Sequence, residues 1–191
     1  DFVIRFQQTD NADFNTANDE DGWMLDNILI ERDPTIYATL PFADGFEGAQ
    51  LNPAWKWVAP TETIESTDWI SNDGLVAITS WLEAVRSGSQ GLQMGRRSDG
   101  NFAVNALDLH LDLQGKEQVF LSFWMKDFAD DTQVQDGLWM SDDGGASFVK
   151  VLGFDFSSWT NGYGQLPPLS IDALAEEFGL ELSSSFVIRF Q

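Results

Sequence analysis

Four tryptophans in the first half of the chain have the chemistry to bind a sugar. Flat indole faces stack on pyranose rings, and polar neighbours bind the hydroxyl groups of the sugar. These residues are Trp55, Trp57, Trp69 and Trp81. Because β-sandwiches also bury tryptophan routinely, the same residues fit a hydrophobic core. Carbohydrate binding is therefore one hypothesis for this chain, and core packing is its alternative.

The stretch SDDGGASF, residues 141–148, matches the Asp-box pattern S-x-D-x-G-x-[ST]-[WF]. In such a turn the Asp carboxylate accepts backbone N–H bonds, a glycine provides positive φ, and the aromatic residue holds the hairpin to the core. The pattern positions are filled by Ser141, Asp143, Gly145, Ser147 and Phe148. Asp boxes occur in sialidases but lie away from the catalytic site. This one predicts a structural hairpin and gives no evidence for glycosidase activity.

The residue pairs that catalysis needs are missing from the sequence. Retaining glycoside hydrolases place two carboxylates on one face of the site, and the nearest E-x-D-x-x-E match has Glu31 and Asp33 but Ile36 in place of the second Glu. The sole histidine, His110, lies on the polar side of an alternating stretch, which favours an exposed strand residue over a catalytic base. No nucleophile elbow, Walker loop or dinucleotide fingerprint occurs. We therefore predict that the chain is not an enzyme.

The charge balance narrows the possible partners. Asp and Glu number 31 against 10 Lys and Arg, which gives a formal charge of −21. Such a chain repels nucleic acid phosphates and anionic membrane surfaces, so we expect no nucleic acid partner. An acidic surface suits cations, and it also simply prevents association. No stretch approaches the ~18 apolar residues of a membrane span, and we expect no membrane insertion.

The elements that must position these residues are mostly β-strands. The stretch NALDLHLDL, residues 105–113, alternates leucine with Asp108, His110 and Asp112. This period of two predicts a strand with every leucine on one buried face and the polar residues on a wet face. By contrast, QVFLSFWMKDF, residues 118–128, is apolar on nearly both faces, which predicts a central strand. Shorter strands are expected at LVAIT from Leu75, GLQMG from Gly91, GLWMS from Gly137, SFVKVLGFDF from Ser147 and WMLDNILI from Trp23.

One helix is predicted near residues 170–179. Ser170 is suited to the N-cap, and Gly179 to the stop. The expected buried stripe consists of Ile171, Leu174, Ala175 and Phe178. Because the other elements are many short strands separated by Gly, Asp and Asn turns, the fold class that we expect is all-β, an antiparallel β-sandwich of the jelly-roll kind with this single helix.

The six residues FVIRFQ occur twice, at Phe2–Gln7 and at Phe186–Gln191. The copies are offset by 186 − 2 = 184 residues, which suits a whole domain in a tandem array and is far longer than a solenoid unit of roughly 20 to 50 residues. The alternative to a tandem array is a circular permutation in which the two ends of the chain overlap by a few residues. Each copy alternates in the same way, and the residues that we expect to be the assembly strands are Phe2, Ile4, Phe6, Phe186, Ile188 and Phe190.

The order of short motifs then resembles a known family. From Leu40 to the end and on into a next copy, the chain reads FADGFEG, SDDGGASF, FVIRF and DGWMLDNI. This succession is similar to the MAM-like and reelin-like jelly rolls, a branch of the concanavalin-like β-sandwiches, once the order is rotated. The resemblance implies that the chain does not begin and end at module boundaries. Residues 1–30 are then the last strands of a preceding module, 31–41 are a connector, and 42–191 are the main body of the next module.

The resemblance also implies a Ca²⁺ site. In those modules the Glu after the opening aromatic residue and the Asp of the closing motif help to bind a structural Ca²⁺, and the matching positions are Glu47 and Asp26, with Asp44 as a further ligand. Ca²⁺ takes six to eight oxygen ligands. The alternative is that these carboxylates cap turns without a metal.

Two functions of different classes follow. The first is a Ca²⁺-stabilised structural repeat of an extracellular fibre or adhesin stalk, secreted or on the cell surface, whose partners are adjacent copies of itself, head to tail. The second is a carbohydrate-binding module. The repeated FVIRFQ strand favours the first, because a stalk gains length by duplicating modules.

Overall fold

The structure is a computed structural model that describes residues 35–58, 74–96, 104–126, 128, 133–154 and 162–191. These residues belong to one compact unit, Thr35–Gln191. They are mostly β, with one α-helix, which confirms the coarse fold class. Among the described residues no helix is long and apolar enough to cross a membrane.

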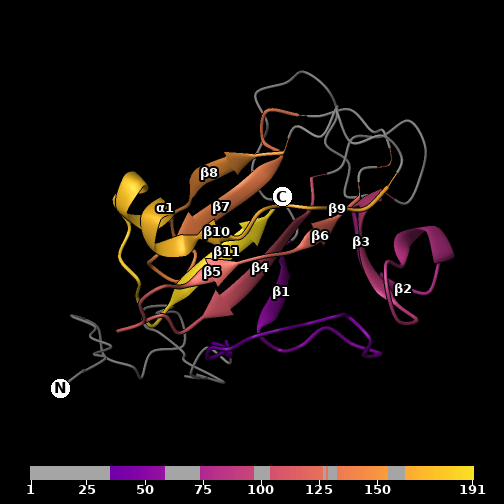
Figure 1. Cartoon of the computed structure of the whole chain (residues 1–191), viewed down its shortest axis with the longest axis horizontal. Helices are drawn as coiled ribbons and strands as arrows, with labels where there is room; N and C mark the ends of the chain where they lie inside the picture. Colours follow the sequence, from indigo (N-terminus) through magenta and orange to yellow (C-terminus); the bar gives the residue numbers. More distant parts are fainter. Residues whose placement is uncertain (1–34, 59–73, 97–103, 127, 129–132, 155–161) are drawn as a thin grey trace, which may run out of the picture. The chain divides into compact units, whose positions relative to one another are not determined.

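A five-stranded antiparallel sheet forms the main layer (Figure 1). Its centre is β11, Phe186–Phe190, which confirms the strand expected for the second FVIRFQ copy. The order of strands in the sheet is β1 (Trp55–Val58), β4 (Ala106–Leu111), β11, β7 (Gly137–Ser141) and β8 (Val149–Gly153). Among the described strands, the halves β1–β4 and β7–β8 are therefore joined through β11.

The expected central strand at residues 118–128 is wrong. This stretch forms two short strands outside the main sheet: β5, Phe120–Leu121, pairs with β10, Leu169–Ser170, and β6, Trp124–Met125, pairs with β9, Gly164–Gln165. Alternate side chains, among them Phe123, pack on the core of the main sheet. On the other side of the stretch, Phe120, Trp124 and Phe128 are 62%, 42% and 47% exposed. The apolar residues of this stretch therefore form one face that packs on the core and one aromatic face that is exposed.

A separate hairpin pairs β2, Gly74–Thr79, with β3, Gly91–Arg96, and both strands were expected from the sequence. A short 3-10 helix, Leu82–Ala84, follows β2. Tyr163 Oη donates a hydrogen bond to the carbonyl oxygen of Ala84 at 2.7 Å, which ties the turn of the hairpin to the segment that leads into β9.

The helix α1, Ile171–Phe178, matches the prediction at both ends. Ser170 Oγ accepts the backbone N–H of Ala173 at 3.2 Å, and Gly179 has φ 72°, the left-handed conformation that favours glycine. Ile171 and Ala175 are buried, but Phe178, which was expected in the buried stripe, is exposed. The helix is too short to cover the sheet with a full stripe.

The prediction that the polar face of β4 is exposed to solvent is also wrong. Leu107, Leu109 and Leu111 lie in the core as predicted, yet Asp108 and His110 are 4% and 5% exposed. The ring of Tyr37 packs edge-on against His110, with 5.3 Å between ring centres. His110 is a buried strand residue and not the exposed one that the alternation suggested. The sheet is therefore covered on both faces at β4, and the jelly-roll topology stays a prediction.

Candidate assembly site

The slot that β11 fills lies between β4 and β7. In register, Phe186 lies opposite Leu111, and Ile188 lies between Leu109 and Met140. Phe186, Val187 and Ile188 are at most 1% exposed. Phe190 packs against the same core, with 5.2 Å between its ring centre and that of Phe123. The expectation that Phe186, Ile188 and Phe190 share one core is confirmed.

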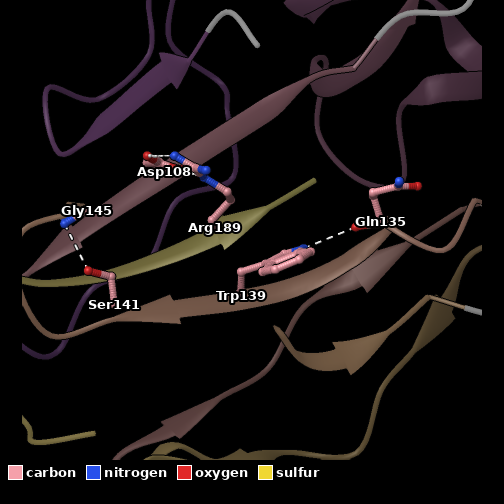
Figure 2. A network of polar contacts seen from close by, with 6 residues as sticks. All are labelled: Asp108, Gln135, Trp139, Ser141, Gly145 and Arg189. Atoms are coloured by element: carbon pink, nitrogen blue, oxygen red, sulfur yellow. Dashed lines mark hydrogen bonds and ion pairs between the residues drawn. The ribbon is translucent and has the colours of Figure 1, made fainter. Parts of the chain in front are cut away.

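On the other face of the sheet, one row of side chains runs across all five strands. The residues of the row are Cα partners from strand to strand, and in order they are Lys56, Asp108, Arg189, Trp139 and Lys150. Figure 2 shows Asp108, Arg189 and Trp139 on neighbouring strands of this face. The row places the negative Asp108 between two cations, and it places Trp139 between two cations as well. Lys150 Nζ lies 6.0 Å from the centre of the Trp139 ring.

Asp108 and Arg189 form a two-bond ion pair at the middle of this row. Arg189 Nε donates to Asp108 Oδ1 at 2.7 Å, and Arg189 Nη2 donates to Oδ2 at 3.0 Å (Figure 2). The guanidinium carbon also lies 3.7 Å from the ring centre of Phe148, which covers the pair from the next hairpin. A buried charge is tolerated in a sheet only with such a partner. Because Arg5 of the first FVIRFQ copy corresponds to Arg189, both copies carry the group that this slot requires.

The Asp-box residues form the hairpin that was predicted from them. Ser141 Oγ donates to Asp143 Oδ1 at 2.7 Å. It also accepts the N–H of Gly145 at 2.9 Å, as Figure 2 shows. Asp143 accepts both the N–H and the hydroxyl of Ser147. Gly145 has φ 93°, as the pattern requires. The hairpin therefore brings Phe148 to the side of Arg189. It also holds the segment before β11, because Asp142 accepts the Glu181 N–H and the Ser183 hydroxyl.

The carboxylate of Glu47 is held by hydrogen-bond donors from a turn far along the chain. It accepts the Ser89 N–H at 3.0 Å, the Ser89 hydroxyl at 2.8 Å and the Gln90 N–H at 3.4 Å. These bonds, the Ser89 hydroxyl first, lower the pKa of Glu47 below its ordinary value. Gly88 in the same turn has φ 75°, and a Cβ there would lie 2.0 Å from Glu47 Oε1. The glycine at position 88 therefore leaves the space that the Glu47 carboxylate occupies.

In the described part of the expected Ca²⁺ site, Glu47 and Asp44 do not share one cluster. The Ser89 N–H and hydroxyl donate to Glu47, while Asp44 accepts the N–H of Phe46 at 2.8 Å and Trp55 Nε1 at 3.1 Å. The two carboxylates thus have separate donor sets, and the described residues contain no group of three or more metal-ligating side chains. Asp26 lies outside the described residues. Ca²⁺ binding stays a prediction, and the turn-capping alternative accounts for Glu47 and Asp44.

The tryptophans that were expected to bind sugar have different surroundings. Trp55 is partly buried and packs among Phe42, Phe46 and Phe190, with its indole N–H bound to Asp44. Trp57 at the sheet edge is 45% exposed, and Trp81 beside the hairpin is 46% exposed. Trp69 lies outside the described residues. Trp55 therefore serves the core, and the exposed indole faces belong to Trp57 and Trp81.

A second group of aromatic residues near Trp81 was missed by the sequence reading. The rings of Trp81 and Phe128 are stacked, with 5.1 Å between centres and an angle of 18°. Lys126 Nζ lies 4.4 Å from the Phe128 ring centre, and the Arg86 guanidinium lies 3.5 Å from that of Trp124. The available signal was the exposed half of the apolar stretch at residues 118–128. We call Trp81, Arg86, Trp124, Lys126 and Phe128 the aromatic–cation surface.

Phe2, Ile4 and Phe6 lie outside the described residues, as do the proposed preceding-module strands of residues 1–30. No family model, curated protein or solved structure matches this chain.

Proposed function

We propose that this chain is a non-catalytic structural repeat of an extracellular fibre or adhesin stalk, in which neighbouring modules are joined head to tail and each central slot is filled by an FVIRFQ strand. The observation that supports this proposal is the position of β11, which carries the second FVIRFQ copy, at the centre of the sheet between β4 and β7. A strand that alone joins two halves of a sheet is indispensable to its module.

The first FVIRFQ copy has the same side chains as β11, so it should fit the same kind of slot between two strands. Phe2, Ile4 and Phe6 match the three residues of β11 that face the core, and Arg5 matches Arg189. One slot cannot hold two identical strands, so the first copy belongs to the slot of another module. In a covalent array that module is the preceding one, and the MAM-like jelly roll is the fold that we propose for each module. The acidic charge of −21 keeps such modules soluble at the cell surface or after secretion.

The test is a chain that ends at Ser185 and so lacks β11. If Phe2–Phe6 fills the slot of a neighbouring molecule, this chain forms head-to-tail oligomers that grow with protein concentration, because a contact of this kind does not close on itself. Analytical ultracentrifugation measures the distribution. A folded monomer at all concentrations would instead establish the permuted alternative, in which the first copy folds back within the same chain.

The matched control is Ile4→Asp in the shortened chain, which places a charge in the core position of the donated strand. It should abolish the oligomers and leave the chain unfolded by circular dichroism. The same substitution in the full chain, where β11 is present, should leave the described fold intact.

Carbohydrate binding is the second candidate, and the aromatic–cation surface favours it. The 46% exposed indole of Trp81, backed by Phe128 and near the cation of Lys126, offers a supported flat face of the kind that stacks on a sugar ring. A glycan array should then show binding that Trp81→Ala removes. Trp57→Ala is the matched control, since Trp57 is exposed to the same extent at the edge of the sheet. Equal loss in both variants, or no bound glycan, would contradict this candidate.

A further inference from the structure

β11 could pair with β4 in more than one register and still bury its apolar side chains. The polar side chains on the other face of the two strands distinguish these registers. We infer that the Asp108–Arg189 pair is the specificity determinant of the FVIRFQ strand: it fixes the register in which the strand enters the slot, and it excludes strands that lack an arginine at the fourth position. Its role between modules rests on the proposed function, but its effect on register belongs to the single chain.

The apolar face of β4 cannot fix the register by itself. It presents the same side chain at every second position, namely Leu107, Leu109, Leu111 and, just beyond the strand, Leu113. The inward residues of β11 are likewise three large apolar side chains, Phe186, Ile188 and Phe190. A one-residue slip turns every apolar residue to the wrong face, but a two-residue slip keeps them all inward.

The opposite face distinguishes these registers because its residues differ. In the observed register Arg189 lies opposite Asp108. Since antiparallel partners here sum to 189 + 108 = 297, a two-residue slip places Arg189 opposite either Ala106 or His110. In both cases Asp108, 4% exposed in the structure, loses both hydrogen bonds from Arg189, and Lys56, its Cα partner on β1, is then the neighbouring cation of the row. Removing one partner from a buried ion pair is strongly unfavourable, whereas the pair itself adds little stability over an apolar pair.

Only a four-residue slip offers Arg189 another carboxylate, that of Asp112. That register would leave most of β4 without β11 beside it, because Phe190 would then lie opposite Leu111, the last residue of β4. The Asp108–Arg189 pair and full overlap of β4 with β11 are therefore both achieved only in the observed register. By the same argument Arg5 enables the first FVIRFQ copy to enter a slot that carries Asp108, in the same register.

The test uses disulfides as register reporters in the full chain, which contains no cysteine of its own. Phe190→Cys with Leu107→Cys reports the observed register, because these residues are Cα partners. Phe190→Cys with Leu109→Cys, or with Asn105→Cys, reports the two slips. Each pair is introduced into the parent chain and into a chain with Asp108→Leu and Arg189→Met, and the disulfide yields under glutathione are read by mass spectrometry.

In the parent chain we expect only the 190–107 disulfide. In the Asp108→Leu, Arg189→Met chain, which stays folded, the excess of this disulfide over the slipped ones should fall by roughly a hundredfold or more. An unchanged excess in the folded apolar variant would overturn the inference. If this variant does not fold, the exchange Asp108→His with His110→Asp decides, because it should transfer the yield from the 190–107 disulfide to the 190–109 disulfide.

A folded exchange variant that keeps the 190–107 disulfide would overturn the inference. Failure of both variants to fold would also overturn it, since the pair would then be required for stability in any register. All yields come from monomeric protein, so they are independent of the oligomers formed by the chain that ends at Ser185, and the two proposals can fail separately.

Discussion

Among the described residues, Glu47 and Asp143 each accept hydrogen bonds from several N–H and O–H groups, and these bonds lower the pKa of both carboxyl groups. The hydroxyls of Ser141 and Ser147 lower the pKa of Asp143 well below its ordinary value of 3.8. The Ser89 hydroxyl and N–H lower the pKa of Glu47 below its ordinary value of 4.5. Hydrogen bonds to the charged form of a carboxyl group favour that form.

Stability should therefore fall with acid. Because both folded pKa values lie below the unfolded ones, the contribution of each group is fully present above the unfolded pKa and is lost as the pH falls through the folded pKa. We expect the urea midpoint to decrease from about pH 5 downward, and to decrease less steeply in the Glu47→Gln and Asp143→Asn chains. Equal slopes in all three chains would contradict this assignment.

The donors around Glu47 also make the Ca²⁺ hypothesis testable at a single residue. An ion at Glu47 must take the carboxylate away from the N–H groups of Ser89 and Gln90. If the predicted Ca²⁺ site exists, chelator should lower the melting temperature relative to millimolar Ca²⁺ and shift the amide resonances of Ser89 and Gln90. The same melting temperature in both conditions, with unchanged amide resonances, would contradict the Ca²⁺ hypothesis.

At the scale of elements, α1 depends on its cap. Ser170→Ala removes the acceptor for the Ala173 N–H and should lower the free energy of unfolding by about 1 kcal/mol. Ser170→Asn retains a capping oxygen and should change it by much less. Chemical denaturation of the three chains measures the difference, and similar losses for alanine and asparagine would argue against a capping role.

The elements that the sequence predicted best are those with clear local signals. The period of two in β4 and β11, the glycines that begin β3 and β7, and the Ser170 and Gly179 limits of α1 depend on neighbours in the chain. The failures depend on the tertiary structure. The apolar pattern at residues 118–128 does not show which partners cover it, and the burial of Asp108 depends on an arginine 81 residues further on. A separation of 42 residues likewise hid the contact between Glu47 and Ser89, and with it the hydrogen bonds that this turn donates to the carboxylate.

At the scale of the whole molecule, the two FVIRFQ copies provide a matched pair of substitutions. Ile188→Ala opens a cavity in the core, where Ile188 is 1% exposed, and should lower the free energy of unfolding by roughly 2–5 kcal/mol. Ile4→Ala changes the same residue in the same six-residue context. If β11 keeps its slot in the full chain, as the proposed function requires, Ile4→Ala should lower the unfolding free energy of the main body by much less. Equal losses would mean that both copies serve one core.

The central place of β11 makes the order of synthesis part of the assembly. β4 and β7 precede β11 in the chain, and 186 − 141 = 45 residues separate the end of β7 from its start. A ribosome adds these in roughly 2–9 s, and during that interval the module holds an open slot between two finished strands. The matching strand that already exists is the earlier copy, Phe2–Gln7. Whether that copy has by then been enclosed in its own module decides between a correctly ordered fibre and one in which neighbouring modules have exchanged their central strands.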